Sequence, residues 1–239
     1  MNMGLGRKPS PPDDRDFALR GYLKEVVPAE RFWLVGEEVL DQGSTPHCVG
    51  FGWAGWGNCE PVDDDYQNDD GHTIYYECKA IDGDPAGESG SYVRSGAKAM
   101  KNRGRLGAYA FGSLEDARRF VLTSGPVTLG IDWYDGMFDP DNAGRIRPTG
   151  AYAGGHCVML YGADEEYAYI QNSWGWSWGL LGGCKMTWSD LLFAFGRYGE
   201  ACAAVELPLE PTPPDPPAPT SWWVRLWRFI RALFYGEGW

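Results

Sequence analysis

Helical and strand patterns occupy different parts of the sequence, and this order limits the fold more than any other feature. Helical spacing of apolar residues occurs in the segments 73–83, 91–104 and 114–125. Later segments are β-rich or alternating and are bounded by Gly or Asp, namely 125–133, 156–164 and 167–174. Helices first and strands later predict an α+β protein with a helical half and a sheet or barrel half. The glycine-rich segment 49–57 alternates almost like a strand, and its local pattern leaves it undecided.

The composition is that of a compact globular protein. The chain has 239 residues, of which 44% are hydrophobic and 15% aromatic, so it can bury one good core or two small ones. Its formal net charge of −12 and its pI near 4.7 argue against nucleic-acid binding, because phosphate contacts need clustered Lys and Arg. We therefore expect no nucleic-acid partner, and we expect the protein to be a monomer.

The first thirty residues lack the apolar run that a secretory signal needs. No stretch reaches the roughly 18 to 20 consecutive apolar residues that would span a bilayer as a helix. We therefore expect a soluble protein that is cytoplasmic, or that is released without a signal peptide.

The six cysteines show neither a CxxC pair nor a regular Cys/His spacing; they are Cys48, Cys59, Cys78, Cys157, Cys184 and Cys202. Neither a disulfide framework nor a zinc site is favoured by such a distribution. We expect reduced cysteines, most of them buried as small apolar residues, with no metal and no cofactor.

The composition changes abruptly after the globular body. Residues 207–220 carry seven prolines and predict an extended linker. Residues 221–239 then read as a basic, aromatic amphipathic helix with Ser221 as its N-cap and Gly236 just past its end. Such a helix suits a membrane surface, and docking on a partner protein or on the body itself are the alternatives.

Gln42 lies six positions before Cys48 in the turn-rich segment 41–50, "DQGSTPHCVG". A cysteine there could be core filler, a metal ligand, half of a disulfide or a nucleophile. A nucleophile needs a base, and the chain holds three histidines. His47 adjoins Cys48 directly and its side chain should diverge from the sulfur, while His72 lies in an Asp-rich stretch that reads as a solvated turn. By elimination, His156 is the best general base.

Two residues downstream of His156 complete a catalytic arrangement. The side-chain oxygen of Asn172 can accept a hydrogen bond from the imidazole and hold the ring, and Trp174 can keep water from that bond. Gln42 would point its side-chain amide at the developing oxyanion, beside the backbone N–H of Cys48.

The order of these elements resembles that of papain-like cysteine peptidases. Gln42, then Cys48 six residues later, then His156 in a Gly-His strand and Asn172 in "NSWGWSWG" sixteen residues on follow the family's order. The resemblance implies that Gln42 belongs to the oxyanion hole, Cys48 is the nucleophile, His156 the base, Asn172 the residue that orients it, and Trp174 the shield.

The resemblance also implies a two-lobed fold. A helical lobe and an antiparallel β-barrel-like lobe would flank the active-site cleft, and Cys48 would open a long central helix whose dipole favours the thiolate. Residues 41–206 would form the catalytic domain, and residues 1–40 an N-terminal segment packing on the body. "KPSPPDDRDFAL" looks like the start of the prosegment-less bacterial, archaeal or phage-type branch. About forty residues precede Gln42, too few for a large inhibitory prosegment, so no zymogen stage is expected.

The sequence departs from the family pattern around the nucleophile. Thr45, Pro46 and His47 stand where the common form has Cys-Gly-Ser, and Val49 stands where it has Trp. One disulfide usual in secreted members is therefore missing.

Substrate-binding residues follow from the same resemblance. Gly90 and Ser91 would pair with the main chain of an extended peptide by strand addition, with Tyr92 near the pocket for the side chain two residues before the scissile bond. Gly155 and Cys157, on either side of His156, would line the same groove. The simpler alternatives are that Gly90 starts a helix and that Cys157 only packs.

The function predicted on this basis is a cysteine endopeptidase acting through a thioester acyl-enzyme on peptides or proteins bound in extended form. One alternative keeps the same triad but cleaves cell-wall peptides or amide conjugates. A second, from a different class, is a catalytically inactive papain-like scaffold tethered by its C-terminal tail, which would then mediate peripheral membrane association.

Overall fold

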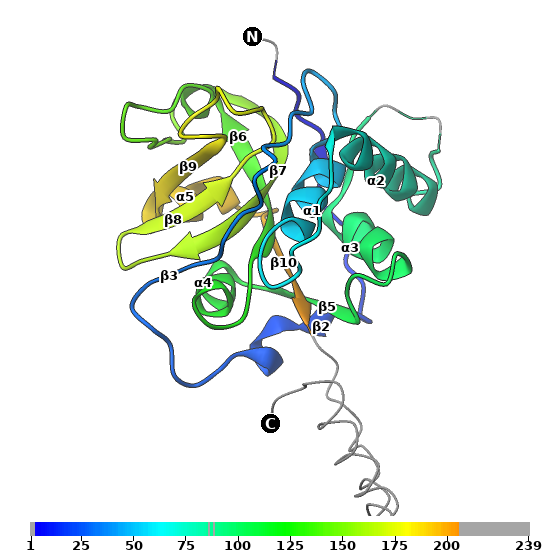
Figure 1. Cartoon of the computed structure of the whole chain (residues 1–239), viewed down its shortest axis with the longest axis horizontal. Helices are drawn as coiled ribbons and strands as arrows, with labels where there is room; N and C mark the ends of the chain where they lie inside the picture. The colour runs from blue at the N-terminus through cyan, green and yellow to red at the C-terminus, as the bar shows by residue number, and fades with distance from the viewer. Residues whose placement is uncertain (1–2, 86, 88, 206–239) are drawn as a thin grey trace, which may run out of the picture. The chain divides into compact units, whose positions relative to one another are not determined.

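Three helices and a large sheet meet along the middle of the molecule (Figure 1). The computed structural model describes residues 3–205 except residues 86 and 88. The proline-rich linker predicted at 207–220 and the amphipathic helix predicted at 221–239 lie outside the described residues. The predicted α+β class and two-lobed arrangement are confirmed.

The helical lobe consists of α1 (Cys48–Gly57), α2 (Asn68–Ile81) and α3 (Val93–Asn102), which contact one another. Helix α2 begins earlier than the predicted 73–83, and His72 lies within it rather than in a solvated turn. The earlier start has a local cause: Gln67 and Asp70 form a reciprocal capping box, and the acidic first turn suits the positive end of the helix dipole.

The sheet lobe carries two further helices, α4 (Leu114–Thr123) and α5 (Trp188–Phe195). Helix α4 coincides with the prediction at 114–125, and the N-cap Ser113 accepts a hydrogen bond from the backbone N–H of Asp116. Short 3-10 turns, η1 (Leu19–Tyr22) and η2 (Asp135–Met137), follow β2 and β6 respectively.

Within the described residues the main sheet has eight strands and is antiparallel except where β2 pairs with β5. Its order is β2 (Phe17–Ala18), β5 (Ala108–Gly112), β10 (Glu200–Val205), β6 (Val127–Tyr134), β7 (Tyr152–Ala163), β8 (Tyr167–Gln171) and β9 (Gly183–Thr187), with β3 (Arg31–Phe32) on β7. A separate parallel pair joins β1 (Arg7–Lys8) to β4 (Ser91–Tyr92). The predicted strands correspond to β6, β7 and β8.

Helix α1 settles the undecided segment 49–57 as helical in spite of its glycines. The helix is buried almost throughout, and the glycines let neighbouring elements approach closely. A Cβ on Gly50 would stand 2.3 Å from the carbonyl oxygen of Gly71 in α2, and one on Gly52 would stand 2.9 Å from the Cys157 sulfur in β7. Tertiary packing therefore outweighs the low helix propensity of glycine here.

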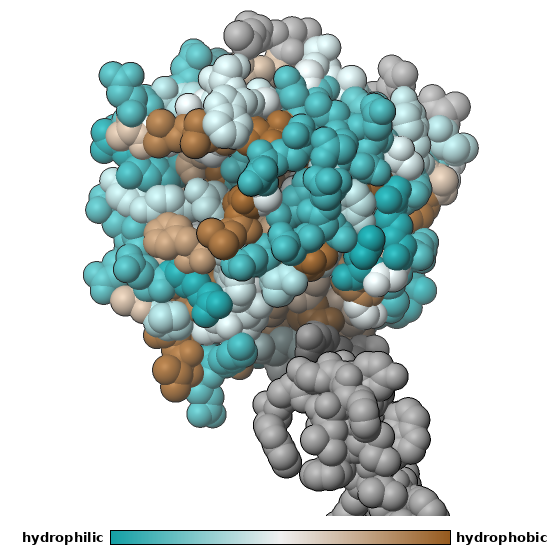
Figure 2. Space-filling view, in the orientation of Figure 1, coloured by the Kyte–Doolittle hydropathy of each residue, from teal (hydrophilic) through white to brown (hydrophobic). Residues whose placement is uncertain are grey.

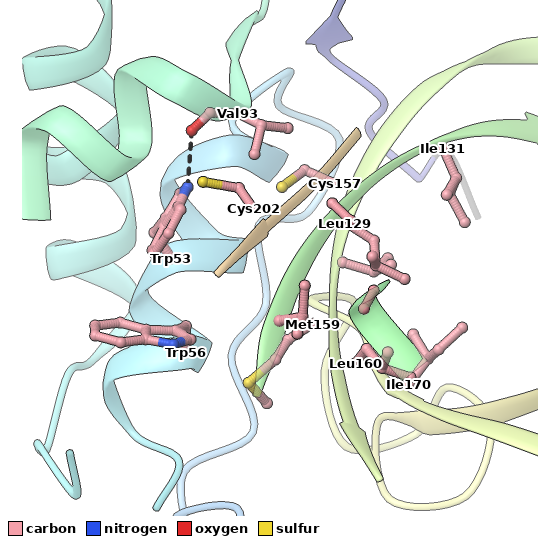
Figure 3. Close-up of a cluster of buried hydrophobic side chains, with 14 of the residues drawn as sticks. Trp53, Trp56, Val93, Leu129, Ile131, Cys157, Met159, Leu160, Ile170 and Cys202 are labelled. Atoms are coloured by element: carbon pink, nitrogen blue, oxygen red, sulfur yellow. Dashed lines mark hydrogen bonds between the residues drawn. The ribbon is translucent and has the colours of Figure 1, made fainter. Parts of the chain in front are cut away.

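A hydrophobic core between α1 and strands β6 and β7 holds the two lobes together (Figure 3). Trp53 of α1 is fully buried, and its indole N–H donates a 3.0 Å hydrogen bond to the carbonyl of Val93 at the start of α3. Leu129, Met159 and their neighbours fill the sheet side of this core. All six cysteines are buried, and each has a free thiol. This packing places the N-terminal end of α1 against β7.

The face shown in Figure 2 is mostly hydrophilic, and its hydrophobic residues form separate small patches. Among the described residues, no helix combines the length and hydropathy that a bilayer crossing requires.

We predict opposite effects for alanine at two glycines of α1. Gly50→Ala should lower the free energy of unfolding by about 1–3 kcal/mol, because its Cβ would meet the backbone of α2. Gly55→Ala should raise it by about 0.5–1 kcal/mol, because nothing lies within 4 Å of that Cβ. Urea unfolding of both variants checks this, and equal destabilisation by the two would contradict the packing described.

Candidate active site

Cys48 is the first residue of α1 and is completely buried. At a helix N-terminus the backbone N–H groups have no intrahelical partner and the helix dipole favours an anion, here a thiolate. The preceding residue, His47, faces away toward α2, where its Nδ1 lies 2.7 Å from Nδ1 of His72 and its ring stacks on Tyr75. His47 is thus not a partner of the sulfur.

His156 enters from β7 and is held by Asn172. Their atoms Nε2 and Oδ1 are 2.8 Å apart, and because an amide oxygen only accepts, the imidazole Nε2 donates. The same Oδ1 accepts a 2.8 Å hydrogen bond from the backbone N–H of Ser173, which fixes the amide. The other ring nitrogen, Nδ1, is buried and has no hydrogen-bond partner among the described residues. His156 therefore presents a free basic nitrogen in the interior of the site.

The imidazole of His156 is enclosed by indoles. Trp174 stacks on it with ring centroids 4.6 Å apart and planes inclined by 20°. Trp133 makes a T-shaped contact with both rings, 4.8 Å from the imidazole and 5.1 Å from Trp174. This enclosure keeps water from the bond to Asn172. Burial lowers the pKa of His156 to about 4, an effect that the hydrogen bond to Asn172 opposes.

The side-chain amide of Gln42 is hydrogen-bonded to Ser173, the residue next to Asn172. Its Oε1 accepts a 2.7 Å hydrogen bond from the Ser173 hydroxyl, while Nε2 donates to the carbonyl of Thr45 at 2.7 Å and to that of Gly4 at 3.2 Å. The indole N–H of Trp174 donates to the same Gly4 carbonyl at 3.3 Å. A peptide carbonyl oxygen thus lies where Gln42 can donate to it.

Solved structures of cysteine proteases share this fold. Xylellain, a cysteine protease from Xylella fastidiosa, superposes with a TM-score of 0.69 over 86% of this chain and 97% of that one, at 20% sequence identity. The proCathepsin B S9 of Trypanosoma congolense gives a TM-score of 0.61 over 85% of this chain and 86% of that one, at 13% identity. The chain has a papain-like fold.

The sequence match covers a smaller share of the chain than the structural matches do. The cathepsin B-like cysteine proteinase 5 of Caenorhabditis elegans is 31% identical over 80 residues, which are 31% of this chain and 23% of that protein. The chain thus matches about a quarter of the length of that curated relative. No family model matches the sequence.

The chain's own N-terminal segment, Met3–Lys8, lies against Gln42, Ser91 and Gly155. The backbone N–H of Gly6 donates to the Gly155 carbonyl at 3.1 Å, and the Gly6 carbonyl accepts from the Ser91 N–H at 2.8 Å. Arg7 and Lys8 then pair in parallel with Ser91 and Tyr92. The predicted main-chain binders Ser91 and Gly155 therefore do contact an extended strand, supplied by the protein itself.

Glycines make this close contact feasible. A Cβ on Gly4 would stand 1.9 Å from the Thr45 carbonyl oxygen, and one on Gly6 would stand 2.1 Å from that of Pro46. Gly90 has a φ of +74°, and its Cβ would stand 1.8 Å from the Gly6 carbonyl oxygen. The expectation that the protein has no zymogen stage stays a prediction.

Burial favours the uncharged forms of both Cys48 and His156. Burial raises the pKa of Cys48 to about 12, although the backbone N–H groups of Cys157, Gly6 and Val49 favour the thiolate. Together with the lowered pKa of His156, this favours a neutral thiol and a neutral imidazole at pH 7. Burial thus outweighs the helix dipole at Cys48.

Cys157 and Tyr92 occupy different surroundings. Cys157 is completely buried among core residues, and burial raises its pKa well above the ordinary value, which matches the packing alternative rather than a groove lining (Figure 3). Tyr92 lies beside the segment Met3–Lys8, with the Lys8 ammonium 5.9 Å from its ring centre.

Sequence reasoning missed Gly4, Gly6 and Arg7, since their partners lie far along the chain. The alternating glycines of "GLGRK" are the local signal that could have indicated them.

The buried histidines predict an acid-sensitive fold. The pKa of His156 lies near 4 in the folded state and 6.5 is its ordinary value, so the unfolded chain binds the proton first and stability falls as the pH drops from 6.5 to 4. A shift of this size in a fully buried group corresponds to about 3 kcal/mol. His47 shifts in the same direction and contributes less, since burial and then the charge of His72 lower its pKa to about 4. His156→Gln should therefore remove more than half of the histidine contribution, measured by urea unfolding at several pH values; an unchanged pH profile would contradict it.

Displacing the segment should expose the sulfur. Gly6→Val would clash with the Pro46 backbone, and a clash of about 1–3 kcal/mol should raise the rate of Cys48 alkylation by iodoacetamide about tenfold or more. Gly21→Val is the matched control, because nothing lies within 4 Å of that position. Peptide mapping by mass spectrometry reads out Cys48 separately from Cys157. Equal alkylation of Cys48 in the two variants would show that the segment does not protect it.

Proposed function

We propose that this protein is a cysteine peptidase that hydrolyses peptide bonds through Cys48, His156 and Asn172. The observation that carries the proposal is the state of His156, on the strand that packs against α1. Its Nε2 is held by Asn172, and its buried Nδ1 has no hydrogen-bond partner in the part of the chain that the structure describes. A basic nitrogen kept free at this place is what the activation of a thiol requires. The papain-like fold supports the same activity.

The reaction begins with a proton transfer. His156 Nδ1 takes the Cys48 proton, and the thiolate attacks the carbonyl carbon of the scissile peptide. The resulting oxyanion accepts hydrogen bonds from Gln42 Nε2 and from the backbone N–H of Cys48, which as the first helical residue has no intrahelical acceptor. The contact of Gln42 with the Gly4 carbonyl supports this role.

Acyl transfer then proceeds in two stages. The tetrahedral intermediate collapses as His156 gives its proton to the leaving amine, and a thioester on Cys48 remains. His156 next takes a proton from water, the hydroxide attacks the thioester, and the acid product leaves with the thiol restored. Asn172 positions the imidazole throughout, and Trp174 shields their hydrogen bond.

The substrate binds as an added strand. Main-chain contacts from Ser91 and Gly155 are independent of side-chain identity and suit an extended peptide of any sequence. Since the segment Met3–Lys8 uses these same contacts, substrate and segment compete, and the active form is the one from which the segment has been displaced.

Cys48→Ala in the Gly6→Val background should reduce hydrolysis of a mixed peptide library by about 10⁴-fold or more, because the proposed thioester forms on Cys48. It should also abolish labelling by an epoxide thiol reagent, with cleavage and labelling both followed by mass spectrometry. Cys157→Ala in the same background is the control and should retain labelling at Cys48. Full labelling of the Cys48→Ala protein would contradict the assignment of Cys48 as the nucleophile.

A further inference from the structure

A buried lysine lies behind the backbone of Gly90 and Ser91. Lys79 belongs to the last turn of α2, and it is completely buried. Its ammonium donates a 2.7 Å hydrogen bond to Asp84 Oδ2 and a 3.1 Å hydrogen bond to the carbonyl oxygen of Gly90. Burying an ammonium is costly even when it is paired, and an apolar side chain of similar length would fill the same space without that cost. Packing alone therefore does not account for a lysine at this position.

Two carboxylates follow the end of α2, where the helix dipole disfavours negative charge. Asp82 is the C-cap residue, and Asp84 lies two positions later. Each carboxylate has a specific partner. The hydrogen bond from Lys79 lowers the pKa of the Asp84 carboxyl, and the Ser91 hydroxyl donates to Asp82 Oδ2 at 2.8 Å. The end of α2 thus holds the Gly90–Ser91 peptide unit from both of its residues.

The contact with Gly90 fixes the direction of the next backbone N–H. A peptide unit is planar, and in the trans form its C=O and its N–H point in opposite directions. Because Lys79 holds the Gly90 carbonyl on the side of α2, the N–H of Ser91 points away from α2. There it donates a 2.8 Å hydrogen bond to the carbonyl oxygen of Gly6. Lys79 therefore aims the backbone donor of Ser91.

Little else in the backbone would keep this peptide unit in place. Gly90 has a φ of +74°, and a glycine reaches many other conformations at little cost. Strand β4 is two residues long, and among the described residues it pairs with β1 and with no other strand. When β1 is displaced, no strand pairing remains to orient the Ser91 N–H, whereas the bond from Lys79 is independent of β1.

We propose that Lys79 is a positioning residue for substrate binding. By holding the Gly90 carbonyl, it keeps the Ser91 N–H directed at the main chain of an extended peptide. The inference rests on the proposed function, since it takes the backbone of Ser91 as a part of the substrate groove. Lys79 does not touch the substrate. Its effect is the same for every peptide sequence, because the contact it controls is made with main-chain atoms.

A binding experiment tests this role without relying on catalysis. The full-length protein carrying Gly6→Val and Cys48→Ala is titrated by fluorescence anisotropy with a labelled peptide of residues 3–8. A second titration uses an analogue in which an (E)-alkene replaces the Gly6–Arg7 peptide bond and so removes the carbonyl that Ser91 contacts. Because one hydrogen bond is lost, the analogue should bind about 2- to 10-fold more weakly. With Lys79→Met added, the two affinities should become equal.

The ratio of the two affinities distinguishes positioning from a general loss of structure. A merely structural role for Lys79 would weaken both ligands alike, and an unchanged ratio in Lys79→Met would overturn the proposal. Arg103→Met is the matched control, because it breaks an ion pair between Glu77 of α2 and the end of α3, and it should keep the ratio. If circular dichroism shows that Lys79→Met is unfolded, Lys79→Met combined with Asp84→Asn takes its place, since it removes both charges of the pair.

A cleavage assay separates this proposal from the proposed function. In the Gly6→Val protein with Cys48 intact, Lys79→Met should raise KM for extended peptides about 2- to 10-fold with little change in kcat, because the lost contact binds substrate and transition state equally. A fall in kcat at constant KM would overturn the positioning role. Cleavage combined with an unchanged affinity ratio would refute the role of Lys79 and leave the peptidase standing. Equal affinities in Lys79→Met, with no cleavage of any peptide by any variant, would refute the peptidase and support the role of Lys79.

Discussion

The close packing of α1 against β7 is the constraint on which the rest of the structure depends. Cys48 lies at the first position of that helix and His156 within that strand, so their side chains can approach each other only if the two elements pack closely. Gly52 permits this approach on the β7 side, and Gly50 permits it on the side of α2. A large buried core around Trp53 then holds the arrangement rigid. The poor helix formers in α1 are thus the residues that allow the site to form.

Solvent access decides the chemical state of the site more than any single contact does. The helix N-terminus and the nearby N–H groups favour a thiolate, yet burial dominates and keeps both Cys48 and His156 neutral. The segment Met3–Lys8 lies at this site, because its Gly4 carbonyl accepts from Gln42, its Gly6 bonds to Ser91 and Gly155, and its Arg7 pairs with Glu200.

The four residues of the proposed catalytic arrangement could be identified from sequence because their order and spacing are local properties. Gln42 and Cys48 lie in one short stretch, and His156 and Asn172 lie in another. The strands β6, β7 and β8 also followed from their alternation, since the buried face of a strand leaves a period of two. Helix α1 could not be assigned from its local pattern and was expected only from the resemblance, because its glycines lower helix propensity and its stability comes from neighbours that are distant in sequence. The start of α2 was placed too late, because its Asp-rich first turn looks like a solvated loop until the capping box is recognised.

The sequence by itself determined which side chains are available for the chemistry and in which elements they lie, since residue type and local periodicity are written in the chain. Only the tertiary structure decided what those side chains face. Arg7 and Glu200 are 193 residues apart, and Gly6 bonds to Ser91 and Gly155 through main-chain atoms that every residue carries. Such pairings leave no mark in residue type, because they depend on distance in space and on the removal of water, and both are set when the lobes and the N-terminal segment pack together.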